Sequence, residues 1–431
     1  MIFELAAVAL LIVLLTLLYQ LKQRKIQLGY RILLSLCMGI AYGLFLKLVP
    51  QYQLLLFIRG FLRLLGTGYL DLLKMLVIPL ILTSLIHAIL NLGYEKSDSI
   101  KKMSFFTCVL LLLMTSAASL VGMLIGKIFN VGEGMQLPAL AIPPEHTYTG
   151  LVDTLLGMIP TNPVAVMSSG NSIAVVIFAV LLGISARMLD EADHELMITF
   201  KKWISSLFAI VKKLAVFILG ITPYGILALM SSLVLDQGIA LLDGMIHFMI
   251  AMYVAMIIVL IMHCVILLMV GENPWHYLQK AYTPLFVAFT TRSSFATLPV
   301  TEETLRHKLN TSQMTATFVP SIGATIGMNA CAGIFPAMLV VMTLTIMHQP
   351  LTSHMILMVM VINAIASLGI SGIPGTAYIA ATVTLTSLNL PYAIVGLVQG
   401  IDPLIDMGRT ATNVSGAMTT ALVVDKVVIT K

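Results

Sequence analysis

The chain has 431 residues and a formal net charge of +5; 59% of its residues are hydrophobic and 10% are charged. Soluble domains carry charges on about a quarter of their residues, so this composition excludes a soluble globular protein and predicts an integral membrane protein embedded in the lipid bilayer. The positive charges concentrate between the apolar segments, and we therefore expect no nucleic-acid partner.

Apolar segments of the length that a membrane helix needs begin at the N-terminus. A helix requires about 20 such residues to cross the bilayer, and these segments lack the alternation of polar and apolar residues that a membrane β-barrel shows. With further helices near the C-terminus, we expect an all-α polytopic membrane protein with about eight or nine transmembrane helices. The expected spans up to residue 270 are 3–20, 30–49, 65–90, 104–128, 152–188, 203–235 and 243–270.

Basic residues set the expected orientation. The first apolar segment lacks the basic region that precedes the apolar core of a secretory signal, so we interpret it as a retained membrane helix. Lys22, Arg24 and Lys25 follow it directly, and such residues favour the cytoplasmic side. We therefore predict a multi-pass membrane protein with its N-terminus outside and its C-terminus in the cytoplasm.

In the segment 152–188, Pro160 and Pro163 precede a cluster of serine, glycine and asparagine residues. Proline removes a backbone donor and disrupts a helix, so this segment is expected to be broken or kinked.

Cysteine and histidine residues show no metal signature. The four cysteines are scattered and form no C-x-x-C pair, so they indicate neither a disulfide framework nor a zinc site. His263 lies in an apolar segment, where a hydrogen-bonded core histidine is expected.

After residue 280 the apolar segments become too short to span, because Gly, Ser, Thr, Pro and Asn interrupt them. Two blocks follow, and each consists of a broken hairpin and then a helix with polar residues at mid-depth, as expected of a transporter with interrupted helices. The polar sequence TTRSS ends in Ser293 and Ser294. Backbone N–H groups at such a hairpin tip, at the start of a half-helix, would form an anion site.

The last apolar segment carries polar residues at a helical spacing. Asp402, Asp406, Arg409 and Asn413 are spaced by four, three and four residues, which places them on one face of one helix. Charged residues at mid-membrane are costly and mark binding sites, and this combination matches a substrate that carries both an ammonium and a carboxylate. The alternative is that Asp406 and Arg409 only neutralise each other.

Seven motifs are distributed along nearly the whole chain: MLVIPLILTSL (75–85), IPTNP (159–163), TPYGILAL (222–229), TRSSFATLP (291–299), GATIGMNAC (323–331), GISGIPGTA (369–377) and DMGRTATNVSG (406–416). In these motifs and in their order the chain resembles the dicarboxylate/amino acid:cation symporters, the glutamate-transporter-like family. GMNAC (327–331), together with SSF (293–295), is most similar to the bacterial L-cystine uptake branch.

The resemblance implies a homotrimer in which each protomer has a static scaffold and a transport domain that moves like an elevator. It implies an extra N-terminal helix and loop (1–28), scaffold helices (29–102), a transport-domain helix with an external loop (103–150), and scaffold or trimerisation helices (151–220). The transport core is then 221–431, with re-entrant hairpins at about 282–300 and 362–388, a broken helix at 317–347 and a last helix at 392–424.

The resemblance also assigns substrate-binding residues. Asp406 would hold the amino group of the substrate, and Asn413 with Ser293 and Ser294 its carboxylate. Arg409 would meet a distal acidic group, with Cys331 nearby. Gly372 and Gly375 belong to the glycine-rich tip of the second hairpin, where glycine permits a tight turn and close backbone approach.

The coupling ion is left open between Na⁺ and H⁺. The sodium sites of the family use two aspartates, and the corresponding positions here are Asn329 and Ala417; Leu112 and Gly327 also depart from the pattern. Backbone carbonyls could still hold a hard cation, and a proton would need a carrier such as Asp402 or Asp406. The implied cation-binding residues are Thr115, Ser116, Thr325, Met328, Asn329, Ser367 and Asp402.

The expected function is import of L-cystine, or of related sulfur or diamino-dicarboxylic amino acids, across a bacterial cell membrane by cation symport without a cofactor. One alternative is transport of glutamate, aspartate or C4-dicarboxylates. An intramembrane serine protease is suggested by GISG (369–372), but the last histidine is His354, upstream of that serine, and a four-residue motif is weak. A passive channel would need rings of like charge or carbonyls, which this chain does not suggest.

Overall fold

The computed structural model describes residues 2–48, 53–91, 98–135, 159–169, 172–238, 240–369, 372 and 377–429. Every regular element within these ranges is a helix. The prediction of an all-α protein is therefore confirmed, and the apolar composition explains why: in lipid a helix satisfies its own backbone donors and acceptors.

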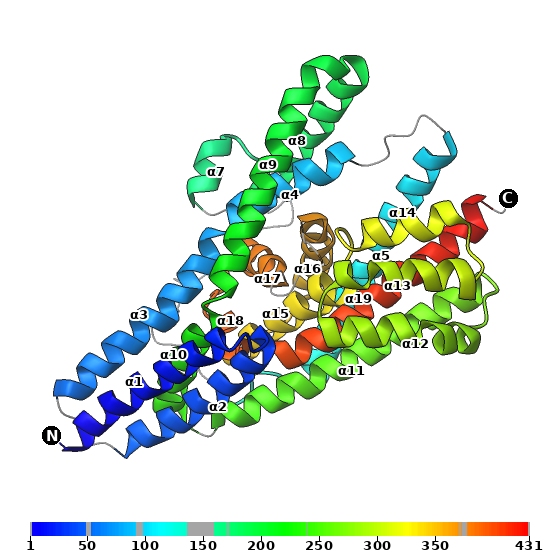
Figure 1. Cartoon of the computed structure of the whole chain (residues 1–431). Coiled ribbons are helices and arrows are strands. Elements are labelled where there is room, and N and C mark those ends of the chain that lie inside the picture. The colour runs from blue at the N-terminus through cyan, green and yellow to red at the C-terminus, as the bar shows by residue number, and fades with distance from the viewer. Residues whose placement is uncertain are drawn as a thin grey trace.

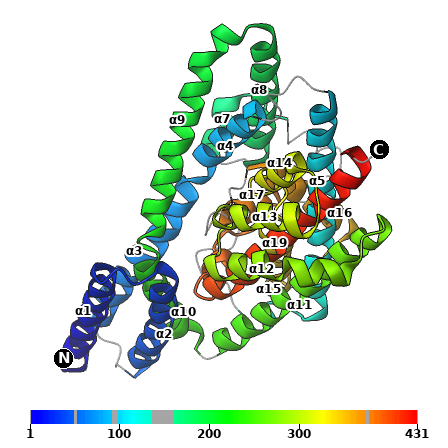
Figure 2. The same ribbon diagram turned by 45° about the vertical axis from the view of Figure 1, so that its right-hand side comes forward.

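A first group of helices forms one side of the molecule, coloured blue to green in Figures 1 and 2. Within it, α10 packs against α2 and α3, and α4 packs against α8 and α9. Although the sequence places residues 222–237 in the predicted transport core, they contact helices of the predicted scaffold. The outer helices are α1 (Ile2–Gln23), α2 (Leu28–Lys47), α3 (Gln53–Met75), α4 (Val77–Asn91), α7 (Pro163–Ser169), α8 (Ser172–Ala192), α9 (His194–Leu219) and α10 (Thr222–Gln237).

The second group is a compact cluster built around α19, which runs through its middle (Figure 2). Nearly every residue of α19 is buried, because α5, α11, α12, α14 and η2 all pack on it. These core helices are α5 (Asp98–Ile128), α11 (Ala240–Met269), α12 (Pro274–Thr291), α13 (Ser294–Glu303), η1 (Thr304–Lys308), α14 (Gln313–Gly323), η2 (Asn329–Ile334), α15 (Phe335–Ile346), α16 (Ser353–Ala366), η3 (Ser367–Gly369), α17 (Ala377–Ser387), α18 (Ile394–Val398), α19 (Asp402–Val424) and η4 (Asp425–Ile429).

Most of the expected spans correspond to helices that could cross a membrane. In the described ranges six helices are long and apolar enough, or seven if α9 and α10, bent by 48°, form one broken span. The six are Leu5–Gln23, Leu28–Lys47, Leu56–His87, Lys102–Ile128, Leu242–Met269 and Asn329–Ile346.

The expected break in 152–188 is visible where the structure describes this segment. Pro163 is the first residue of α7, and Asn162 caps this helix by accepting hydrogen bonds from the N–H groups of Val164 and Ala165. The next helix, α8, begins at Ser172. Proline at the first helical position needs no donor, so Pro163 starts a helix here instead of kinking one.

The first predicted hairpin is a pair of helices, α12 and α13, that pack on each other. Arg292 turns the chain with a left-handed backbone (φ 54°), and Ser293 caps α13 by accepting a hydrogen bond from Ala296 N–H at 3.2 Å. The second pair consists of α16 and α17, joined through η3. Of its tip the structure describes Gly372, whereas Gly375 lies outside the described residues.

The two remaining core segments are interrupted helices. The predicted broken helix comprises α14, five non-helical residues from 324 to 328, the short π-helix η2, and α15. The predicted last helix is divided as well: α18 ends at Val398 and α19 begins at Asp402, with Pro403 in its first turn. The charged residues therefore begin at the N-terminus of α19, next to the non-helical residues 399–401 that separate it from α18.

Candidate functional site

The tips of the two hairpins meet at the break in the interrupted helix. Ser293 Oγ donates to the Gly372 carbonyl oxygen at 3.1 Å, and Gly372 N–H donates to the Ala324 carbonyl oxygen at 2.9 Å. A Cβ on residue 372 would lie 2.8 Å from both the Ala324 oxygen and the Cβ of Ser294. Glycine is needed here because the three segments approach more closely than a side chain allows.

The predicted charged face of α19 is a buried ion-pair cluster. Arg409 Nη2 donates to Asp402 Oδ1 at 2.5 Å and to Asp406 Oδ1 at 3.1 Å. The exposed fractions of Asp402, Asp406 and Arg409 are 7%, 3% and 0%. Two carboxylates thus share one guanidinium in a setting where water screens little. Although the sequence analysis places Asp402 among the cation-binding residues, the structure places it against Arg409.

Part of the hydrogen-bonding capacity of this cluster is unused. Among the described residues, Asp406 Oδ2, Arg409 Nε and Arg409 Nη1 are buried and have no hydrogen-bond partner. Leaving such a group unpaired costs about 1–3 kcal/mol, and more when it is charged. The unpaired atoms are one acceptor, which can accept a hydrogen bond from an ammonium, and two donors, which can donate to a carboxylate.

Phe335, the first residue of α15, supports the guanidinium from one face. The Arg409 Cζ lies 4.3 Å from the centre of the Phe335 ring, a cation–π contact worth about 2 kcal/mol when desolvated. Because Phe335 itself packs on Phe248 and Tyr378, the position of the guanidinium is fixed by the core. An arginine held this way can orient a ligand without first losing its own rotational freedom.

Asn413 and Cys331, two predicted substrate-binding residues, contact each other one turn further along α19. Asn413 Oδ1 accepts hydrogen bonds from the N–H groups of Ala330 (2.8 Å) and Cys331 (3.4 Å), and its Nδ2 donates to Cys331 Sγ at 3.0 Å. In this structure Asn413 therefore holds the start of η2 against α19.

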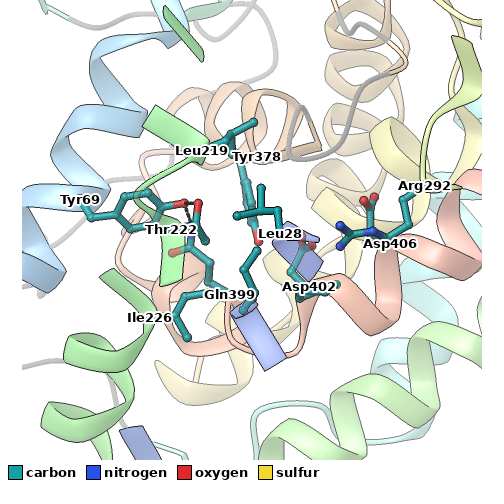
Figure 3. Close-up of a pocket in the computed structure, with 12 residues that line it drawn as sticks. Leu28, Tyr69, Leu219, Thr222, Ile226, Arg292, Tyr378, Gln399, Asp402 and Asp406 are labelled. Atoms are coloured by element: carbon teal, nitrogen blue, oxygen red, sulfur yellow. Dashed lines mark hydrogen bonds between the residues drawn. The ribbon is translucent and has the colours of Figure 1, made fainter. Parts of the chain in front are cut away.

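A cavity opens beside the charged cluster, between the outer helices and the core (Figure 3). Arg292 reaches it from the first hairpin tip, on the same side as Asp406. Asp402 and Gln399 continue the wall toward the break before α19, and Tyr69 closes it from α3. Arg292 of the first hairpin tip and Asp402 and Asp406 of α19 therefore line one cavity, whereas Ser293, Ser294 and Gly372 do not line it.

Next to the charged cluster lies a neutral polar network that the sequence analysis did not identify. Asn329 Nδ2 donates to Thr115 Oγ1 at 3.2 Å and to the Gly327 carbonyl oxygen at 3.3 Å, so that its Oδ1 faces His263 Nε2 at 3.2 Å. On the other side of the ring, His263 Nδ1 lies 3.1 Å from Ser415 Oγ.

The network continues through Ser415 to Tyr277 Oη at 2.9 Å, so it joins α5, η2, α11, α19 and α12. A side chain at Gly416 would overlap Asn329 Oδ1, which explains the glycine. The sequence predicts a hydrogen-bonded core histidine at His263, and this is confirmed: its exposed fraction is 0% and both ring nitrogens have partners. Its two partners come from η2 and α19, far away in the sequence, so no local pattern could have revealed them.

The structure brings some of the implied cation-binding residues together. Thr115 lies on Asn329, and the Ser367 carbonyl oxygen accepts a hydrogen bond from Gly327 N–H at 3.4 Å, beside Met328. Both polar atoms of the Asn329 amide are already engaged. The hydroxyl groups of the others donate to backbone carbonyl oxygens: Ser116 to Met360, Thr325 to Ile322 and Ser367 to Ala364.

The chain is similar to known symporters and uptake proteins over nearly its whole length. The model of the sodium:dicarboxylate symporter family matches residues 28–427. The L-cystine uptake protein TcyP of Bacillus thuringiensis (strain Al Hakam) is 36% identical, with 97% of this chain and 93% of the relative covered. TcyP of Shouchella clausii is 34% identical, with 95% and 91% covered. An uncharacterized symporter of Haemophilus influenzae is 34% identical, with 97% and 98% covered.

Proposed function

The chain belongs to the sodium:dicarboxylate symporter family, and on this premise we propose that it imports L-cystine by secondary active symport with a cation. It is a multi-pass membrane protein and a transporter rather than an enzyme, so the protease alternative raised by GISG is set aside. The proposal concerns the substrate, the coupling ion and the mechanism.

One observation carries the proposal: the buried cluster on α19 keeps unpaired groups of both signs. Asp406 Oδ2 is a free acceptor for an ammonium, and Arg409 Nε and Nη1 are free donors for a carboxylate. Filling them with an amino acid removes the cost of burying unpaired charge. The names of two relatives, L-cystine uptake proteins, support cystine as the amino acid.

In the proposed mechanism the two hairpin tips act as gates. The contact of Ser293 with Gly372 separates when substrate enters or leaves and forms again over the filled site. The core around α19 then moves as a unit along the outer helices, an elevator movement within a homotrimer. Because an empty site leaves charged groups unpaired, closure is more favourable when substrate is bound, which suppresses leak.

For the coupling ion, the name of the family favours sodium. Asn329 carries no charge and its amide is engaged by His263 and Thr115, so a sodium ion near it would be held by carbonyl oxygens of the unwound segment around Met328. We propose a single cation near this segment, with Na⁺ preferred over H⁺.

The test is uptake of radiolabelled L-cystine into proteoliposomes with sodium and pH gradients imposed separately. Accumulation above the external concentration under a sodium gradient alone is the expected result, and accumulation under a pH gradient alone would assign the proton instead. Excess unlabelled L-glutamate or succinate should compete weakly. If either competes better than cystine itself, the substrate is an acidic amino acid or a C4-dicarboxylate, and the cystine assignment fails.

The oligomeric state is tested on the same preparation. Chemical crosslinking in the membrane should give a trimer band that is independent of protein density. The predicted orientation, with the N-terminus outside, is tested by protease protection of tags placed at each end of the chain.

A further inference from the structure

Gln399 is a buried polar residue that neither the ion-pair cluster nor the neutral network uses. It lies in the break between α18 and α19, and 1% of it is exposed. Its Nε2 donates to Tyr69 Oη at 3.0 Å, and Tyr69 Oη in turn lies 2.7 Å from Thr222 Oγ1. Its carbonyl oxygen Oε1 has no hydrogen-bond partner among the described residues.

The unpaired oxygen belongs to a row of acceptors along one wall of the cavity. Asp406, Asp402 and Gln399 all line this cavity, and Figure 3 shows them in sequence from the charged cluster toward Tyr69. Asp402 and Asp406 are four residues apart on α19, an advance of about 6 Å, and Gln399 lies three residues before Asp402 in the break before this helix. The row therefore extends beyond the volume that a small amino acid would fill at Asp406. The apolar side chains of Leu28, Ile32 and Ile226 also line the cavity.

This arrangement is complementary to a molecule with two amino acid heads. One head binds at Asp406 and Arg409, and a second ammonium reaches Asp402 and Gln399 through a short apolar linker. The carboxylate of Asp402 is engaged by Arg409 at Oδ1, and the neutral oxygen of Gln399 adds an acceptor without adding another negative charge. A buried carbonyl oxygen with no donor becomes satisfied when an ammonium arrives.

We propose that Gln399 and Asp402 form a subsite for the second ammonium group of a two-headed substrate. The inference rests on the proposed function, because it specifies how the cavity binds the second head of cystine. The subsite makes Gln399 a specificity-determining residue: it strengthens binding of cystine and its thioether analogues and does nothing for a ligand with a single head.

The cavity has a volume of about 30 Å³, enough for a water molecule but not for an amino acid head. Filling the subsite therefore requires Tyr69 and the outer helices to move away from Gln399. The hydrogen bond from Gln399 to Tyr69 crosses from the core to the outer helices, and it would break in this step.

The first experiment changes the ligand and leaves the protein intact. Wild-type protein in proteoliposomes imports radiolabelled L-cystine in competition with two mixed disulfides: cysteine with 3-mercaptopropionate, which lacks the second ammonium, and cysteine with cysteamine, which lacks the second carboxylate. The first should compete about tenfold more weakly than unlabelled cystine, and the second within about threefold of it, since a hydrogen bond to a charged group is worth about 1.5–3 kcal/mol. Equal competition by the two disulfides overturns the inference.

The second experiment changes the residue. Gln399→Leu should raise the KM for cystine and the inhibition constant of L-cystathionine about tenfold, and leave the inhibition constant of S-methyl-L-cysteine, which has one head, unchanged. Gln20→Leu, at an exposed position of α1, is the matched control and should behave as wild type. An equal shift for one-headed and two-headed ligands in Gln399→Leu would mean that Gln399 is structural.

The two proposals fail in different ways. If wild-type protein neither binds nor imports cystine, the proposed function is wrong and the subsite falls with it. If wild-type protein imports cystine but does not distinguish the two mixed disulfides, only the subsite is wrong.

Discussion

Two buried polar clusters lie side by side on α19, and they differ in how completely they are hydrogen-bonded. In the neutral network of Thr115, Asn329, His263, Ser415 and Tyr277, each of these side chains contacts the next, and both nitrogens of His263 have partners. The charged cluster around Arg409 contains two ion pairs but leaves three buried atoms unpaired among the described residues.

This difference distinguishes polar groups that hold the fold together from polar groups that are available to bind a ligand. A buried polar group that is fully paired rigidifies the core, whereas one that is unpaired costs free energy that a ligand can recover. We interpret the neutral network as a fixed link between helices of the core. The charged cluster, with Gln399 beyond it, is interpreted as the place where the protein is completed by its substrate.

The largest effect is expected from removing the free acceptor of the charged cluster. Asp406→Asn should lower cystine uptake by about 100-fold or more, because it removes the charge that holds the ammonium and leaves Arg409 paired with Asp402 alone. Uptake into proteoliposomes measures this, and size-exclusion chromatography checks folding. Asp243→Asn, whose side chain is 76% exposed, is the control. Wild-type uptake by Asp406→Asn would remove Asp406 from the site.

His263→Ala removes the central residue of the neutral network, and we expect it to lower the stability of the folded protein. The change leaves the Ser415 hydroxyl and the side-chain amide oxygen of Asn329 without their shared partner. We therefore expect a loss of about 2–4 kcal/mol in the free energy of unfolding. Thermal unfolding in detergent should show a clearly lower midpoint. His247→Ala, at a side chain that is 54% exposed, should leave the midpoint unchanged.

If His263→Ala is as stable as wild type but imports cystine poorly, the interpretation of this network as purely structural is wrong. The affinity of the folded variant for cystine, measured from the concentration dependence of uptake, separates these outcomes.

A smaller effect is expected when Arg409 is replaced by another cation that lacks the planar guanidinium group. Arg409→Lys retains a cation, yet a lysine lacks the planar fork that contacts two carboxylates at once and stacks on Phe335. We expect cystine uptake to fall about tenfold. Uptake of S-methyl-L-cysteine, whose single head would use the same guanidinium, should fall by a similar factor. Arg59→Lys, in a half-exposed pair with Asp236, serves as the control, and wild-type uptake of both substrates by Arg409→Lys would remove the guanidinium from the site.

The smallest effect is expected at the hairpin tips. Ser293→Ala removes the cap of α13 and the hydrogen bond to Gly372, which together are worth about 1–2 kcal/mol. The closed state should become less favourable, so cystine efflux without a gradient should rise several-fold while the affinity changes little. Ser321→Ala, at an exposed position of α14, is the control; unchanged efflux would show that the contact between the tips does not gate the site.

Much of the fold follows from the sequence because it depends on local properties. The length of the apolar segments predicts the helices Leu5–Gln23, Leu28–Lys47 and Leu242–Met269. After residue 280 the polar residues, glycines and prolines that interrupt the apolar segments predict the hairpins and the broken helix. The spacing of Asp402, Asp406 and Arg409 predicts one polar face, since a regular helix repeats every 3.6 residues. Even the break in 152–188 is encoded locally, in Pro163 and its capping Asn162.

What the sequence alone could not determine is how each polar atom is paired. The partners of His263 come from η2 and α19, and the partner of Gln399 is Tyr69 of α3, at the other end of the chain. The family resemblance places Asp402 among the cation-binding residues, and only packing decides that it lies against Arg409. Hydrogen bonds between distant segments have no period along the sequence. They arise when helices pack, and this packing leaves Asp406, Arg409 and Gln399 unpaired while completing the network around His263.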